Sequence, residues 1–115
     1  MQIDIQSLNF TLTDGLRERV EHRLRFALTR FQDQLGAINV RLSDINGPRG
    51  GVDKRCLVRI KATGSSDIVV VDTEADLYVA VDRAVGRAQR TLERQRQRAS
   101  DALNGLLQRG GDGGL

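Results

Sequence analysis

Apolar and polar residues alternate in four short stretches of the chain, which is the pattern of half-buried β-strands. These stretches cover residues 2–6, 38–42, 55–61 and 68–71. The segments 46–51 and 64–66, rich in glycine, serine or proline, separate the last three stretches. Such composition predicts hairpin connections. The sequence therefore predicts one early strand and three later strands that follow one another.

Two longer stretches carry apolar residues at steps of three and four, the spacing of a helix with one buried face. The first begins at Thr13, a residue type that caps helices, and is expected to end at Gly36. The second begins at Thr73–Asp76, which resembles a capping box with acids that complement the helix dipole. Its apolar positions are Leu77, Val81, Ala84, Val85, Ala88 and Leu92.

The resulting order β-α-β-β-β-α predicts an α+β fold of two layers. Both helices are expected on one face of a four-stranded sheet. A chain of 115 residues is long enough for one domain. We expect residues 1–99 to form this domain. Residues 100–115 are expected to be a flexible C-terminal tail, because four of the last six residues are glycine.

Arginine is concentrated on one side of the second helix. Five arginines recur at steps of four, three, four and four residues, so at about 100° per residue they share roughly one quarter of the helical wheel, opposite the apolar positions. They are Arg83, Arg87, Arg90, Arg94 and Arg98. Residues 83–98 hold six arginines and one glutamate, whereas the whole chain has a net charge of only +3. Guanidinium groups bind phosphate with two parallel hydrogen bonds, so this face predicts nucleic-acid binding.

Basic residues outside the second helix are weaker candidates. On the first helix, Arg19, Arg23 and Arg30 flank the apolar face, but Glu18 and Glu21 balance much of their charge. The polar side of the predicted sheet carries four more basic residues, which are Arg41, Arg55, Arg59 and Lys61. A half-exposed sheet commonly has such residues, so both RNA contact and simple solvation remain open for them.

Few residues are suited to catalysis or to metal binding. His22 is the only histidine and Cys56 the only cysteine, and one of each cannot build a metal site or a nucleophilic site. Cys56 keeps step with Val58 and Ile60, which indicates a core position. The sequence thus predicts no enzyme, no metal, no cofactor and no small-molecule substrate. No apolar run approaches the ~20 residues of a membrane span, and no secretion signal is visible, so a cytoplasmic location is expected.

Two segments resemble a known family, the ribosome hibernation-promoting factors and ribosome-associated inhibitors, also called the sigma-54 modulation protein family. Residues 76–82, followed by the basic positions up to Arg98, are similar to the start of the second helix of that family. Residues 13–17 are similar to the start of its first helix. The resemblance covers residues 1–98, and it implies a fold similar in layout to double-stranded RNA-binding domains.

The resemblance implies a short form of the family that binds the 30S subunit and the 70S ribosome. The site would lie on 16S rRNA in the channel for messenger and transfer RNA, and translation would be inhibited in stress or stationary phase. The expected RNA-binding residues are the five arginines of the second helix together with Arg19 and Arg23, and we expect the free protein to be a monomer. Two alternatives stay open: a regulatory module that binds a sigma factor, and a protein that binds structured RNA away from the ribosome.

Overall fold

The computed structural model describes residues 1–45, 53–64 and 66–113. Its elements are β1 (Gln2–Leu8), α1 (Asp14–Leu28), the 3₁₀ helix η1 (Thr29–Gln34), β2 (Leu35–Asp44), β3 (Lys54–Ala62), β4 (Ile68–Glu74) and α2 (Leu77–Gly113). The predicted order of strands and helices is confirmed. The glycine-rich link at 46–51 lies outside the described residues.

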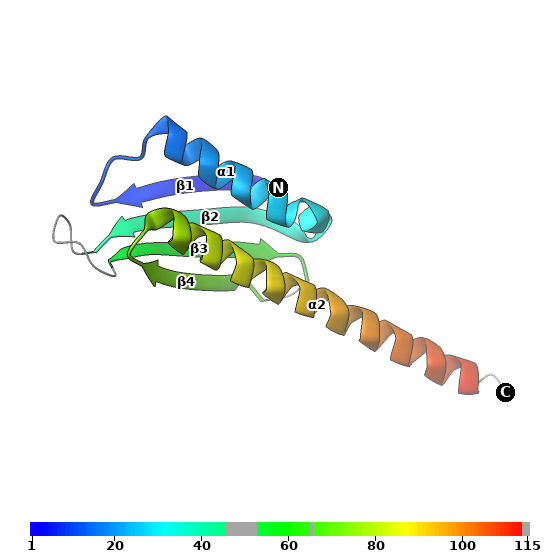
Figure 1. Cartoon of the computed structure of the whole chain (residues 1–115). Coiled ribbons are helices and arrows are strands. Elements are labelled where there is room, and N and C mark those ends of the chain that lie inside the picture. Colours follow the sequence, from blue (N-terminus) through cyan, green and yellow to red (C-terminus); the bar gives the residue numbers. More distant parts are fainter. Residues whose placement is uncertain (46–52, 65, 114–115) are drawn as a thin grey trace.

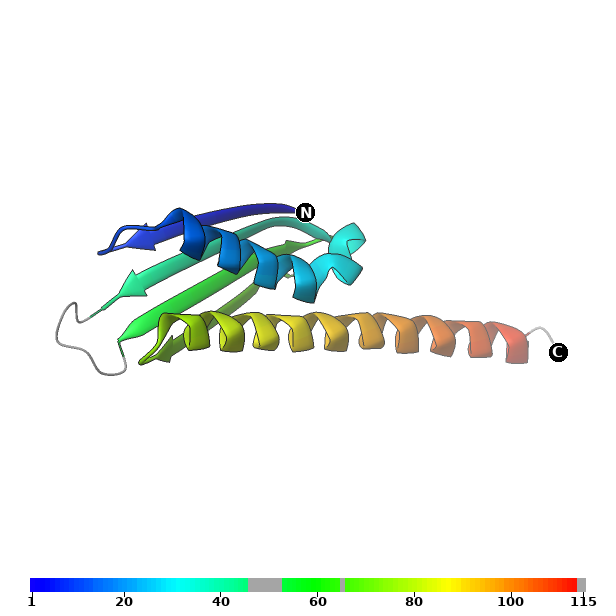
Figure 2. The same cartoon turned by 45° about the horizontal axis from the view of Figure 1, so that its top comes forward.

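The four strands form one sheet in the order β1-β2-β3-β4. β1 and β2 are parallel, and the other two pairs are antiparallel. A parallel pair needs a crossover connection, which α1 supplies here. Both helices cover the same face of the sheet and leave the other face open (Figures 1 and 2). The predicted two-layer α+β fold is therefore confirmed.

The core lies between the sheet and the two helices and is almost wholly aliphatic. Each strand contributes every second residue to it, as Ile38, Val40 and Leu42 do in β2. The apolar stripe of α2, from Val81 to Leu92, packs against these strands. Phe31 is the largest fully buried side chain. The period of two in the strands and the spacing of three and four in the helices thus identified the buried residues correctly.

The first helix is shorter than the sequence predicts. Thr13 caps α1 as expected, since its side-chain oxygen accepts a hydrogen bond from the backbone N–H of Leu16 at 3.2 Å. The α-helix nevertheless ends at Leu28, where the Thr29 hydroxyl donates to the carbonyl of Arg25 and the chain tightens into η1. The prediction that the helix continues to Gly36 is wrong, because Gly36 lies inside β2.

The second helix starts later and ends later than the sequence predicts. Thr73 and Glu74 belong to β4, so the cap is Asp76, whose carboxylate accepts hydrogen bonds from the backbone N–H groups of Tyr78 and Val79. Residues 100–113 were expected in the flexible tail, but α2 continues to Gly113 and projects beyond the sheet (Figure 2). The assignment of residues 1–99 as a ribosome-binding domain stays a prediction.

Candidate nucleic-acid interface

Five arginines follow one side of α2, and all five side chains are exposed. We call Arg83, Arg87, Arg90, Arg94 and Arg98 the arginine ladder. The sequence placed this ladder opposite the buried stripe. The contacts described next show that its first half lies instead at the flank of α2 that adjoins β4. A helical wheel gives angles around the helix axis, but only the tertiary structure shows which strand lies beside each angle.

The strand β4 supplies carboxylates to the first two arginines of the ladder. The Nε atom of Arg83 lies 3.3 Å from a carboxylate oxygen of Glu74. The Nη1 atom of Arg87 lies 3.7 Å from a carboxylate oxygen of Asp72 and donates a hydrogen bond of 2.9 Å to the carbonyl of Val71. Sequence reasoning missed these pairs, because residues 72–74 lie in β4, outside the helical wheel of α2, and meet α2 only through the fold. Part of the positive charge at the start of the ladder is therefore balanced.

The second half of the ladder has no carboxylate partner among the residues that the structure describes. Arg94 donates only to the hydroxyl of Thr91, at 3.3 Å. Arg90 and Arg98 have no hydrogen-bond or ion-pair partner within the described part of the chain. Unbalanced positive charge is thus concentrated from residue 90 onward, on a rigid helical support.

Three arginines outside α2 contact that helix, namely Arg19 and Arg23 from α1 and Arg30 from η1. The guanidinium of Arg19 stacks over the ring of Tyr78, 4.2 Å from its centre. Arg23 pairs with Asp82 at 3.2 Å and also donates to the Asp82 backbone carbonyl at 3.4 Å. Arg30 forms an ion pair with Glu93, the only acid between residues 83 and 98. The structure therefore gives these side chains a role in packing the helices together, beside any role in binding.

Two adjoining hollows lie along the ladder. The first is lined by Arg23, Asp72, Asp82, Arg83, Gly86, Arg87 and Arg90. The second runs beside β4 and is lined by residues 67–70 together with Arg87, Arg90, Thr91, Arg94 and Gln95. Arg87 and Arg90 border both hollows. The fold thus brings Arg23 of α1 together with three members of the ladder, whereas Arg19 lies near the start of α2 beside Tyr78.

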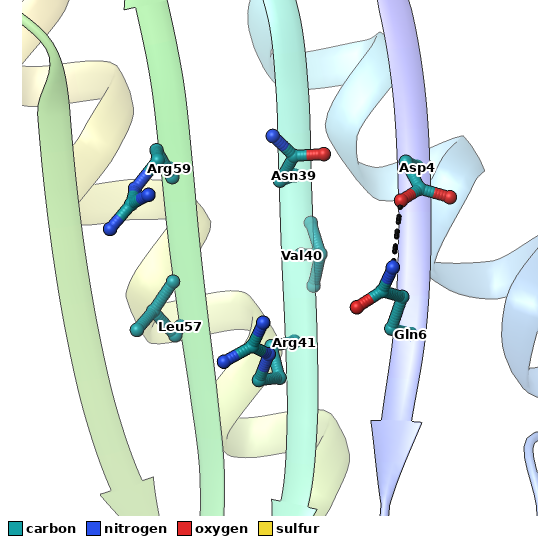
Figure 3. A pocket seen from close by; sticks show the side chains of 7 residues that line it. All are labelled: Asp4, Gln6, Asn39, Val40, Arg41, Leu57 and Arg59. Carbon is teal, nitrogen blue, oxygen red and sulfur yellow. Dashed lines mark hydrogen bonds between the residues drawn. The ribbon is translucent and has the colours of Figure 1, made fainter.

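A second cationic surface covers the open face of the sheet (Figure 3). Arg41 and Arg59 line a shallow hollow there with Asp4, Gln6, Asn39, Val40 and Leu57. Asp4 accepts a hydrogen bond from the Gln6 amide at 3.2 Å. In the register of the sheet, Arg41 lies opposite Leu57 and Asn39 opposite Arg59. This surface lies on the side of the sheet away from the helices, so one flat ligand cannot contact both surfaces.

The remaining candidate residues take structural positions. Cys56 is fully buried, and burial, with a further contribution from the carboxylate of Asp72, raises the pKa of its thiol to about 12. A thiol held protonated in this way is a poor nucleophile. Within the described residues, no group of three or more potential metal-binding side chains comes together. None of the helices in that part of the chain is both long enough and apolar enough to cross a bilayer.

Comparison with known proteins identifies the family. Residues 3–100 match the family described as sigma 54 modulation protein / S30EA ribosomal protein. The chain belongs to this family. The resemblance seen in residues 13–17 and 76–98 is therefore confirmed, and the match includes all seven predicted RNA-binding arginines.

Solved structures agree with this assignment. The N-terminal domain of Protein Y from Thermus thermophilus is 32% identical, and the alignment covers 82% of this chain and 98% of that one, with a TM-score of 0.68. A ribosomal subunit interface protein from Coxiella burnetii is 22% identical over 84% of this chain and 99% of the other, with a TM-score of 0.70, and it supports the fold alone. A comparison with curated protein sequences gives no match.

Proposed function

We propose that this protein binds the small ribosomal subunit through 16S rRNA and inhibits translation during stress by occupying the channel for messenger and transfer RNA. The description of the family to which the chain belongs includes a ribosomal protein, and this supports ribosome association. In this proposal the protein acts by occupying the channel, so it requires a docking surface and no catalytic group.

The observation that carries the proposal is the unbalanced charge of Arg90, Arg94 and Arg98 on one flank of α2. The helical backbone that carries these arginines is already ordered, so no backbone entropy is lost there when they bind phosphates. Double-helical RNA offers little sequence to read, hence selectivity would come from the shape of the channel. If four to six arginines each contact one phosphate, log affinity against log salt should have a slope of about −3 to −5.

The test compares two double variants with the same change in charge. Arg90→Gln with Arg94→Gln removes two arginines of the ladder, and glutamine keeps helix propensity nearly constant. Arg17→Gln with Arg25→Gln removes two exposed arginines from α1, outside the set assigned to RNA contact. Binding to purified 30S subunits would be measured by sedimentation at several salt concentrations. We expect the ladder variant to lose at least about tenfold in affinity and the α1 variant to lose little.

Two results would count against the proposal. Wild-type protein that fails to sediment with 30S subunits or 70S ribosomes at low salt would refute ribosome binding itself. Equal losses in the two double variants would mean that overall charge, not the ladder, determines affinity. Inhibition would be measured separately, as loss of protein synthesis in a cell-free translation reaction to which the wild type or either variant is added.

A regulatory protein-binding role is the second candidate. It is favoured by the apolar residues Val69 and Val71, which are half exposed on β4. Val71 lies opposite Leu57, and Val69 lies opposite Arg59 in the neighbouring strand. The family description also names sigma 54 modulation. Replacing Val69 and Val71 by threonine keeps β-branched side chains in β4. If this variant loses the effect on transcription but keeps 30S binding, the two functions use opposite faces of the molecule.

A further inference from the structure

A glycine occupies the middle of α2 where the fold does not require one. Gly86 has an ordinary helical backbone conformation, since the positive φ values of the described residues fall elsewhere. A β-carbon added at Gly86 would meet only the ends of two flexible side chains, the Nη1 atom of Arg90 at 3.8 Å and the Nη2 atom of Arg23 at 4.0 Å. Both are ordinary contact distances. Glycine in a helix interior is less favourable than alanine, so the residue lowers helix stability without a packing reason.

What glycine changes at this position is the space between two guanidinium groups. Arg23 reaches across from α1 and Arg90 comes from the next turn of α2, so both groups border the surface above Gly86. Arg90 has no partner among the described residues, and Arg23 keeps spare N–H donors beyond those that bind Asp82. An anionic oxygen above Gly86 could therefore accept hydrogen bonds from both groups at once.

We propose that Gly86 and the surrounding arginines form a seat for one backbone phosphate of the bound RNA. This inference rests on the proposed function and specifies where α1 and α2 share a single phosphate. The hollow is lined by four arginines and two aspartates, so its net charge of about +2 suits a phosphodiester. The absence of a side chain at residue 86 lets the phosphate approach the helix.

The two aspartates do not fill the seat. The Asp82 carboxylate is bound to the Nε atom of Arg23, and the Asp72 carboxylate lies 3.7 Å from the Nη1 atom of Arg87 on the β4 side of the helix. They therefore orient the guanidinium groups around Gly86. The neighbouring hollow shares Arg87 and Arg90, so an RNA strand with one phosphate in the seat can continue along the ladder. This continuity favours a phosphate within RNA over an isolated anion.

The test fills the seat without removing any charge. Gly86→Ala and Gly86→Gln place one carbon and then a longer neutral side chain between Arg23 and Arg90. Gly105 is the matched control on the same helix, because a β-carbon there meets nothing within 4 Å. All four variants, including Gly105→Ala and Gly105→Gln, should melt at or above the wild-type temperature, since alanine and glutamine favour helix. Affinity for 30S subunits is measured by sedimentation over a series of salt concentrations.

We expect Gly86→Gln to lose about tenfold or more in affinity, with Gly86→Ala intermediate and both Gly105 variants unchanged. The magnitude of the salt slope should fall by about 0.7–0.9 for Gly86→Gln, because one phosphate contact is lost. Arg90→Gln tests the same contact by removing one of its two guanidinium groups. If both variants act on the same phosphate, the loss of affinity in the double variant should be smaller than the sum of the two single losses.

Each outcome decides between the hypotheses. Wild-type binding together with equal affinity and slope for Gly86→Gln would overturn the phosphate seat and leave the proposed function intact. Fully additive losses for Gly86→Gln and Arg90→Gln would also overturn it, because the two residues would then act at separate places. Absence of wild-type binding would instead refute the proposed function on which the seat depends.

Discussion

The cap of α2 allows a quantitative test of how this fold is held together. One carboxylate oxygen of Asp76 accepts hydrogen bonds from the N–H groups of Tyr78 at 2.7 Å and Val79 at 3.4 Å. It satisfies donors that otherwise lack a partner at the start of a helix, and its charge interacts favourably with the helix dipole. We therefore consider Asp76→Ala, which removes both contributions, and Asp76→Asn, which retains an oxygen acceptor and removes the charge.

The expected magnitudes follow from these contacts. Loss of a capping side chain costs about 1 kcal/mol, and loss of a charge near a helix N-terminus costs roughly 0.3–1 kcal/mol. Asp76→Ala should therefore lower the free energy of unfolding by about 1–2 kcal/mol, and Asp76→Asn by under about 1 kcal/mol. For a domain of this size, each 1 kcal/mol corresponds to roughly 3–6 °C in the melting temperature.

Urea unfolding followed by circular dichroism would measure these differences. The loss for Asp76→Asn should shrink at high salt because it is electrostatic, whereas the greater part of the loss for Asp76→Ala should remain. Two results would refute the reasoning: an Asp76→Ala protein as stable as the wild type within about 0.5 kcal/mol, or an Asp76→Asn protein as unstable as Asp76→Ala. The first would mean that α2 does not depend on its cap, and the second that the hydrogen bonds contribute nothing.

Two further predictions concern the core. The raised pKa of Cys56 means that the unfolded chain loses the thiol proton at lower pH than the folded chain, so the stability that the thiol contributes should be intact below about pH 9 and fall as pH rises toward 12. The fall should be at most about 4 kcal/mol relative to a Cys56→Ala control in urea unfolding, and parallel pH dependence in both proteins would contradict this. Leu92 is 2% exposed and Leu106 is 64% exposed on the same helix. Leu92→Ala should therefore lower the free energy of unfolding by about 2–5 kcal/mol, and Leu106→Ala by under about 0.5 kcal/mol, in the same assay. Equal losses would disprove the assignment of the core.

The two-layer fold was predictable because burial leaves a direct trace in the sequence. A strand with one buried face must alternate, and Cys56, Val58 and Ile60 do so in β3 with complete burial. The helix boundaries were less predictable because they depend on local competition. The α-helix α1 ends at Leu28 and the chain continues as the 3₁₀ helix η1, although the apolar spacing continues to Phe31. Glycine content suggested that the chain would leave helical structure near residue 100, yet α2 continues to Gly113.

The composition of the candidate interface was predictable, but its electrostatics were not. The spacing of the ladder and its lack of interleaved acids are visible in the sequence. The carboxylates of Asp72 and Glu74 reach Arg87 and Arg83 only because β4 lies beside α2. The role of Gly86 could not be predicted from the sequence, since its place between Arg23 and Arg90 depends on the packing of the two helices. The contact of these arginines with RNA stays a prediction.

The hydrogen bond from Arg87 to the Val71 carbonyl changes what the outer edge of the sheet offers to another chain. β4 is an outer strand with a neighbour on one side only, and such strands present backbone groups to which the strand of another chain can pair. The Nη1 atom of Arg87 donates a hydrogen bond of 2.9 Å to the carbonyl oxygen of Val71, and the guanidinium places a positive charge beside β4. Charged side chains at sheet edges discourage aggregation. Arg87 therefore makes the outer edge of β4 less suited to pairing with a strand of another chain.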